Sequence, residues 1–317
     1  MSKSGKQERR KNPLLSSGKK ITSSCSSPGN YYLAVFRQCG RQITGTIVIA
    51  VAVLWAVSGC HSKSGKASDP PFRVVATDAG FDAPDTAPAG FRHIVFENHG
   101  SEIHEVMLVK LPQGMTVAEY VSAVRSGSLF PAGALDYSGA GLMSPGESVE
   151  IWVKLDPGQY ILICWNNGHA RSTPPHPIAV QYTISDDLPP KEDVTVKLID
   201  FRYELLGRLR KGPQIIRIEN AGPTMHEMDI FRLHEGKTLA DVRRWRKDDG
   251  RGPAPADAMG GVLDSHDLKR VIWMRKNFAA GRYVLHCEMP LVTNSQPTNL
   301  EITHADLGMV REIEIAE

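Results

Sequence analysis

The chain has 317 residues, of which 41% are hydrophobic and 23% are charged, and its formal net charge is +2. This length can bury one large core or two ordinary ones, and the composition excludes a disordered, collagen-like or polytopic membrane protein. Residues 1–43 contain nine lysines and arginines and one acidic residue, so the rest of the chain carries a net charge of −6. A mildly acidic folded part argues against nucleic acid as a partner.

The N-terminal segment has the pattern of an export signal or a membrane anchor. Residues 1–43 are basic and lack apolar periodicity, which predicts a disordered cytoplasmic tail. Residues 44–59 carry no charge and contain an apolar run, Ile47–Val57, which is short for a membrane span and typical of a signal-peptide core. The run leads into Val57-Ser58-Gly59-Cys60, which resembles the lipobox of bacterial lipoproteins. That resemblance implies lipidation of Cys60, and an uncleaved single-pass anchor is the alternative.

Both alternatives place the folded part of the chain on the same side of the membrane. The positively charged tail stays in the cytoplasm, so the residues after 60 are predicted to lie outside it. We therefore expect a protein of the bacterial cell envelope, on its extracytoplasmic face, with the membrane as a partner through the N-terminal segment. Residues 60–70 are expected to form a linker.

Two stretches of the chain recur after about 122 residues. Glu97–Glu105 aligns with Glu219–Glu227, and Gly158–Cys164 aligns with Gly281–Cys287. The interval from the histidine of the first stretch to the cysteine of the second is 60 residues in the first copy and 61 in the second. A period of this length is too long for a solenoid repeat and predicts two tandem domains.

The repeat predicts the domain boundaries and also predicts that the cysteines of the two domains do not form a disulfide with each other. Domain 1 is expected at residues 71–186 and domain 2 at residues 192–317. Cys164 and Cys287 occupy equivalent positions in different domains, and such positions rarely come within disulfide reach. Each is therefore predicted to be an unpaired thiol, which outside the cytoplasm must be buried or bound to a metal to escape oxidation.

The local patterns within each copy are mostly those of strands. Short alternating or β-branched runs end at Asn or Gly turns, and one helix with a capping threonine interrupts each copy. The predicted fold class is all-β, with two tandem antiparallel Greek-key β-sandwiches that each carry a short helical insertion. The predicted strands are 92–97, 105–109, 148–153, 160–164, 214–219, 227–231 and 310–315, and the predicted helices are 116–124 and 238–246.

Four residues of domain 2 form a set of metal donors in chain order. His226 begins a predicted strand, Cys287 ends one, and His304 and Met309 precede the last strand. A thiolate with two imidazoles makes a trigonal site, and a thioether makes a weak axial ligand. This combination of soft and borderline donors suits copper.

These residues make the chain resemble the cupredoxins, the family of blue-copper β-sandwich proteins. The resemblance covers both repeats and implies that His226, Cys287 and His304 are equatorial copper ligands and Met309 the axial one. It also implies electron transfer to a redox partner that the sequence does not name. Two features depart from the family pattern: His304 follows the cysteine by 17 residues, which requires an outward loop over 289–303, and Glu227 stands where Asn is common.

Domain 1 repeats only part of this set. His104 and Cys164 are in register with the domain 2 residues, and either His169 or His176 could supply the second imidazole. No methionine stands at the axial position. Domain 1 is therefore expected either to hold a second copper without an axial Met or to have kept the fold and lost the metal.

A copper enzyme is a weaker alternative, and so is a metal-free interaction domain. In copper nitrite reductases and laccases, a histidine adjacent to the copper cysteine ligates a second copper, and His286 precedes Cys287 here. The rest of that set is missing: the chain contains no His-x-His, and Phe231 stands where nitrite reductases have a second histidine. His286 is accordingly expected to be a surface residue, and the chain to be an electron carrier or copper-binding module rather than an enzyme.

Overall fold

The computed structural model describes residues 70–317 except 249, 264–269 and 294–295. The predictions for the basic tail, the apolar segment 44–59 and Cys60 lie outside the described residues. Within the described part, no helix has the length and apolar character needed to cross a bilayer.

Domain 1 is a sandwich of two sheets, with strand orders β2-β1-β3-β6 and β8-β7-β4-β5. The long strand β3 belongs to both sheets, because its first residues pair with β8 and the remainder pairs with β6. Its elements are β1 (Phe72–Thr77), β2 (Gly80–Asp82), β3 (Thr86–Asn98), β4 (His104–Lys110), α1 (Val117–Arg125), β5 (Leu135–Met143), β6 (Ser148–Leu155), β7 (Gly158–Ile163), η1 (Asn166–Gly168), α2 (His169–Ser172) and β8 (His176–Ile184).

Domain 2 repeats this arrangement with strand orders β10-β9-β11-β14 and β18-β15-β12-β13. It adds a two-stranded hairpin, β16–β17, that has no counterpart in domain 1. Its elements are β9 (Val194–Ile199), β10 (Arg202–Leu206), β11 (Gly212–Asn220), β12 (Glu227–Leu233), α3 (Leu239–Lys247), β13 (Ala256–Leu263), β14 (Val271–Phe278), β15 (Gly281–His286), β16 (Pro290–Thr293), β17 (Gln296–Thr303) and β18 (Val310–Ile315).

The all-β class, the repeated sandwich and the two helical insertions are confirmed. Each helix begins where the sequence predicts: Thr116 and Thr238 form capping boxes with Glu119 and Asp241. The pairing is less uniformly antiparallel than expected, because β1–β3, β3–β8 and β9–β11 are parallel. The outward loop expected over 289–303 is the hairpin β16–β17.

The sheets of the two domains are continuous with each other. β6 pairs with β14, and β5 pairs with β13, both antiparallel. These are equivalent strands of the two repeats, and Ile151 faces its repeat equivalent Met274 at the junction. An internal twofold relation therefore connects the domains, and the tandem sandwiches share their sheets instead of standing apart.

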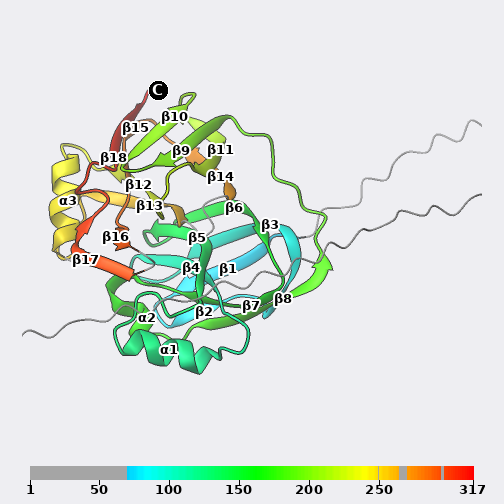
Figure 1. The fold of residues 1–317 in the computed structure, drawn as a ribbon. Coiled ribbons are helices and arrows are strands. Elements are labelled where there is room, and N and C mark those ends of the chain that lie inside the picture. The colour runs from blue at the N-terminus through cyan, green and yellow to red at the C-terminus, as the bar shows by residue number, and fades with distance from the viewer. Residues whose placement is uncertain (1–69, 249, 264–269, 294–295) are drawn as a thin grey trace, which may run out of the picture. The chain divides into compact units, whose positions relative to one another are not determined.

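The helices bury the outer faces of the sheets that carry the repeat motifs. Val242 and Trp245 of α3 form a cluster with Phe231 and Val284, and Tyr120 of α1 packs in the equivalent place. Figure 1 shows α3, in yellow, beside β12. The strands under each helix are thus buried on both faces, which determines what surrounds the residues at their ends.

Candidate metal centre

Strand order brings the repeat-motif histidine and cysteine of each domain to one end of the sandwich. β4 and β7 are antiparallel neighbours, so His104 at the start of β4 lies beside Cys164 just after β7. β12 and β15 stand in the same relation, which places His226 beside Cys287. The second imidazole in each domain then comes from the chain that follows the cysteine.

In domain 2 the three predicted equatorial donors converge. The donor atoms of His226, Cys287 and His304 all lie within 4.8 Å of one another. The two Nδ1 atoms are 3.1 Å apart, and the Cys287 sulfur is 3.6 Å from His304 Nδ1. All three side chains are buried, with at most 1% of each residue exposed.

The hairpin explains how 17 residues can separate Cys287 from His304. The His304 backbone N–H donates to the Met289 carbonyl at 2.9 Å, and the Ala305 N–H donates to the Cys287 carbonyl at 2.9 Å. These two bonds close the base of β16–β17. The insertion therefore leaves the site and returns at the same place, as the sequence requires.

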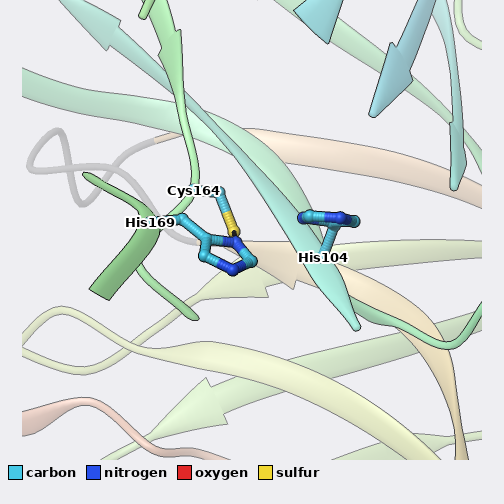
Figure 2. A group of neighbouring side chains, drawn as sticks. All are labelled: His104, Cys164 and His169. Atoms are coloured by element: carbon cyan, nitrogen blue, oxygen red, sulfur yellow. Dashed lines mark hydrogen bonds between the residues drawn. The ribbon is translucent and has the colours of Figure 1, made fainter. Parts of the chain in front are cut away.

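In domain 1 the structure selects between the two candidate histidines. His169, at the start of α2, joins His104 and Cys164 in a cluster like that of domain 2. Figure 2 shows the Cys164 sulfur directed at the His169 ring, with His104 facing them from β4, and the sulfur lies 3.5 Å from His169 Nδ1. His176 is outside this cluster: it begins β8, and its Nε2 lies 3.4 Å from Asp85 Oδ1.

An aspartate fixes one histidine of each cluster. Asp78 Oδ1 is 3.0 Å from Nε2 of His104, and Asp200 Oδ1 is 2.8 Å from Nε2 of His226. When Nε2 is the protonated nitrogen, the lone pair of Nδ1 faces the other two residues of the cluster. A carboxylate that holds the second ring nitrogen is the usual support of a metal-binding histidine.

Two glycines allow these contacts. A Cβ on Gly222 would lie 2.6 Å from Asp200 Oδ1 and 3.0 Å from His226 Nε2. A Cβ on Gly100 would meet the domain 1 pair at 2.4 and 2.7 Å. Any larger residue would therefore displace the aspartate from the histidine, which gives both repeat motifs a physical reason for glycine.

The glutamate after each motif histidine contacts the cysteine through its backbone. The N–H of Glu105 lies 3.5 Å from the Cys164 sulfur, and that of Glu227 lies 3.4 Å from the Cys287 sulfur. The Glu105 carboxylate also accepts a hydrogen bond from Trp165 N at 2.8 Å. In domain 1 the glutamate side chain thus ties the strand of the histidine to the chain beyond the cysteine.

Burial sets the protonation of the donors. It raises the pKa of the Cys287 thiol well above its usual value, and the nearby Glu227 raises it further. Burial, together with His226, lowers the pKa of His304 to about 4, and burial lowers the pKa of His226 against the opposing effect of Asp200. Both imidazoles are therefore neutral near pH 7, as a metal requires, whereas the thiol must lose a proton when a metal binds.

The predicted axial residue lies next to the cluster. Met309 is fully buried, its N–H donates to the His304 carbonyl at 2.9 Å, and its carbonyl accepts from Cys287 N. Met225 and Met289 are buried in the same core cluster, and the sequence analysis did not single them out.

The expectation that His286 is a surface residue is wrong. It is 2% exposed, its ring lies 6.0 Å from that of Phe231, and its Nδ1 is 3.1 Å from Glu288 Oε1. Period-two alternation placed it on the solvent side of β15, but α3 covers that side. Among the described residues it joins neither cluster of metal donors.

Comparison with known proteins gives likenesses to solved structures only, since no family model and no curated protein matches the sequence. An auracyanin from Roseiflexus castenholzii is 21% identical over 36% of this chain and 98% of its own, with a TM-score of 0.25. Auracyanin A, a blue copper protein from Chloroflexus aurantiacus, is 23% identical over 35% of this chain and all of its own, with a TM-score of 0.26. A multicopper oxidase is 14% identical over 78% of this chain and 88% of its own, with a TM-score of 0.23.

The strand order and the two clusters describe the architecture of this chain independently of these likenesses. Each half is a two-sheet β-sandwich in which a strand-leading histidine and a strand-ending cysteine meet a second histidine at one end. The chain therefore contains two copies of one β-sandwich, each with a His-Cys-His cluster at one end.

Proposed function

We propose that the chain is an extracytoplasmic copper protein that transfers electrons through a centre made by His226, Cys287, His304 and Met309. The observation that supports this most directly is the convergence of two imidazole nitrogens and one thiol sulfur in a buried site. These donors fit copper, because thiolate and thioether select soft ions and imidazole suits copper in both oxidation states. Copper bound there would supply a one-electron Cu(I)/Cu(II) couple.

The protein's own part is to hold the donors still. Asp200 fixes the His226 ring, the base of the hairpin fixes His304, and the Glu227 N–H restrains the Cys287 sulfur. Because all of these supports are already formed among the described residues, little rearrangement is needed when the charge at the centre changes. The buried surroundings also exclude water from the donors.

Domain 1 is proposed to hold a second copper through His104, Cys164 and His169. It has the same three donor types and the same aspartate support, without a methionine at the equivalent place. The side chain of His169 is 15% exposed, whereas His304 is 1% exposed and its ring centroid lies 5.0 Å from that of Phe201. Domain 1 therefore offers the more accessible imidazole edge for exchange with a redox partner.

A copper titration of the full chain tests this proposal. Copper should produce an intense visible charge-transfer band, and Cys287→Ser should remove the domain 2 part of it because a hydroxyl cannot replace the soft thiolate. Cys164→Ser is the matched variant and should remove only the domain 1 part. A chain that retains no copper, or a band that survives both substitutions together, would favour metal-free interaction domains instead.

The location is proposed on the N-terminal sequence alone. We infer that Cys60 is lipidated and anchors the protein to the extracytoplasmic face of the membrane. Metabolic palmitate labelling should mark the wild-type chain and not Cys60→Ala, with Cys25→Ala as the control. Membrane retention of both variants without label would instead support an uncleaved anchor.

A further inference from the structure

The three most exposed large apolar side chains of the described residues lie close together in the chain, where domain 1 ends. Tyr182 is 87% exposed, Ile184 71% and Leu188 77%. Every other large apolar side chain of the described residues is less than half exposed. Single exposed apolar residues are ordinary on a protein surface, but a group of them marks a contact surface. We call these three residues the apolar patch.

The sheet explains why this stretch is uncovered. β7 begins at Gly158, whose register partner is Val180, so no residue of β7 pairs with 181–184. On the other side, β3 pairs with the end of β8 through Ala89, opposite Ile184. Val180, the last residue with a partner on both sides, is 4% exposed. The end of β8 therefore extends beyond the strand that would otherwise cover it.

A buried arginine ties this end of domain 1 to the residue at which the described chain begins. Arg92 donates from Nη2 to the Pro70 carbonyl at 3.0 Å and from Nη1 to Asp187 Oδ2 at 2.8 Å. The Ser185 hydroxyl accepts a further bond from Nη1 at 3.1 Å. Arg92, Ser185 and Asp187 are all buried. Pro70 is thus held beside the segment that carries the apolar patch.

The chain that precedes Pro70 is short. Pro70 is ten residues beyond Cys60, and the apolar segment 44–59 ends one residue before that cysteine. Ten residues reach at most about 36 Å when fully extended, and a random coil of that length spans about 18 Å. On either proposed form of attachment, the patch is therefore kept close to the bilayer surface.

The side chains of the patch suit a membrane surface. Tyrosine favours the membrane–water interface, where its ring is in an apolar layer and its hydroxyl in water, and isoleucine and leucine favour the acyl chains. The neighbouring charged residues Asp186, Lys191 and Glu192 together carry no positive charge. The attraction is therefore apolar and requires no anionic lipid.

The apolar patch and the domain 1 cluster lie at opposite ends of β8. β8 begins at His176, which pairs with Leu162, two residues before Cys164. It ends nine residues later at Ile184, so its rise of about 3.3 Å per residue separates the two ends by about 26 Å. A bilayer in contact with the patch therefore leaves the cluster at the far end of the strand.

We propose that the apolar patch of Tyr182, Ile184 and Leu188 inserts into the surface of the bilayer to which the N-terminal segment attaches the protein. The contact adds a second point of attachment beside Pro70 and so fixes an orientation that a single tether leaves free. In that orientation the domain 1 cluster faces the aqueous compartment, where a soluble redox partner can reach it. This inference rests on the proposed membrane attachment and does not depend on copper.

Tryptophan quenching by brominated lipid tests the proposal, with the full chain reconstituted into phosphatidylcholine vesicles. Flotation with the vesicles first measures attachment. The fluorescence that Tyr182→Trp adds to that of the parent should fall at least about twofold in brominated vesicles, because a side chain inserted at the interface meets the bromine atoms. Ser172→Trp, at an exposed position near the other end of β8, is the matched control and should add fluorescence that is not quenched.

A second variant shows that the patch itself makes the contact. Ile184→Asp together with Leu188→Asp, in the Tyr182→Trp chain, should abolish most of the quenching and leave flotation unchanged. Both side chains are exposed, so the fold should be retained.

The outcomes that contradict the proposal are distinct from failure of the attachment. A chain that floats without quenching at the Tyr182 position would overturn the bilayer contact and leave the attachment standing. Blue-shifted but unquenched emission there would overturn it too, since a second copy or another protein would then cover the patch. Equal quenching at the Ser172 position would refute the orientation. A chain that does not float would overturn the attachment and the contact together.

Discussion

Replacing Asp200 by alanine should loosen the domain 2 copper site without unfolding it. The Asp200 carboxylate lies 2.8 Å from Nε2 of a fully buried His226, and Thr224 Oγ1 lies 3.3 Å from the same nitrogen. Loss of such a supporting partner typically lowers metal affinity by about 10–100-fold. That range corresponds to about 1.4–2.7 kcal/mol of binding free energy.

The structure also orders a graded pair of variants. Asp200→Asn keeps an oxygen that can accept from Nε2–H and loses only the charge, so its effect should lie at the low end of the range. Asp200→Ala removes both and should lie at the high end. Copper affinity is measured by competition with a Cu(I) chelator in a Cys164→Ser background, where domain 2 alone retains its thiol.

The second domain supplies the control. Asp78→Ala, in the same background, should leave domain 2 affinity unchanged, because Asp78 supports His104 of the other cluster. If Asp200→Ala binds copper within about twofold of its parent, well short of the loss expected when the partner that holds a ligand is removed, the reasoning is refuted. An equal loss from Asp78→Ala would refute it as well, since the effect would then not be local.

Three further outcomes are expected. Met309→Leu should keep copper and raise the reduction potential measured by spectroelectrochemistry, because loss of a weak axial donor favours Cu(I); an unchanged potential would mean another group is axial. Copper binding to domain 2 should release one proton, since the pKa of Cys287 is raised and the pKa values of both imidazoles are lowered. The apparent dissociation constant for copper should therefore fall about tenfold for each unit by which the pH rises between about pH 6 and 8. Calorimetry in buffers of different ionisation enthalpy measures the proton release, and the absence of release would contradict this prediction. Asp187→Ala should lower the free energy of unfolding by about 3–5 kcal/mol in urea titrations, because it leaves buried Arg92 without the carboxylate 2.8 Å away; a loss under about 1 kcal/mol would show that other groups replace it.

Much of the fold could be predicted because the repeat doubles each local signal. The alternation in 92–97 recurs in 214–219, and the capping threonine at 116 recurs at 238, so each pattern had an independent copy. β5 and β13 could not be predicted from pattern. They contain Gly139 and Gly261, where a Cβ would meet a backbone carbonyl of the neighbouring strand at 1.8–1.9 Å, and glycine carries no strand signal.

The sequence predicts a ligand where residue type and chain order are enough to identify it. It does not predict a ligand whose position depends on the path of the backbone after the cysteine. His169 and His176 both follow Cys164, and only the turn into α2 brings the first of them to the sulfur. Asp78 and Asp200 were missed because they precede the recognised motif, although their separation of 122 residues matches the repeat. His286 was misplaced because alternation assumes that one face of a strand meets solvent.

The pairing of β6 with β14 and of β5 with β13 has a consequence for how such a chain arises. Equivalent strands meet edge to edge around an internal twofold, which is the geometry of an isologous homodimer whose two subunits have been joined end to end. Either half alone would expose two unpaired strand edges, and the unpaired N–H and C=O groups of such edges favour pairing with another chain. Separately produced halves should therefore re-form the same arrangement as dimers. The linker at 186–191 joins covalently two halves whose relative arrangement the strand edges already specify.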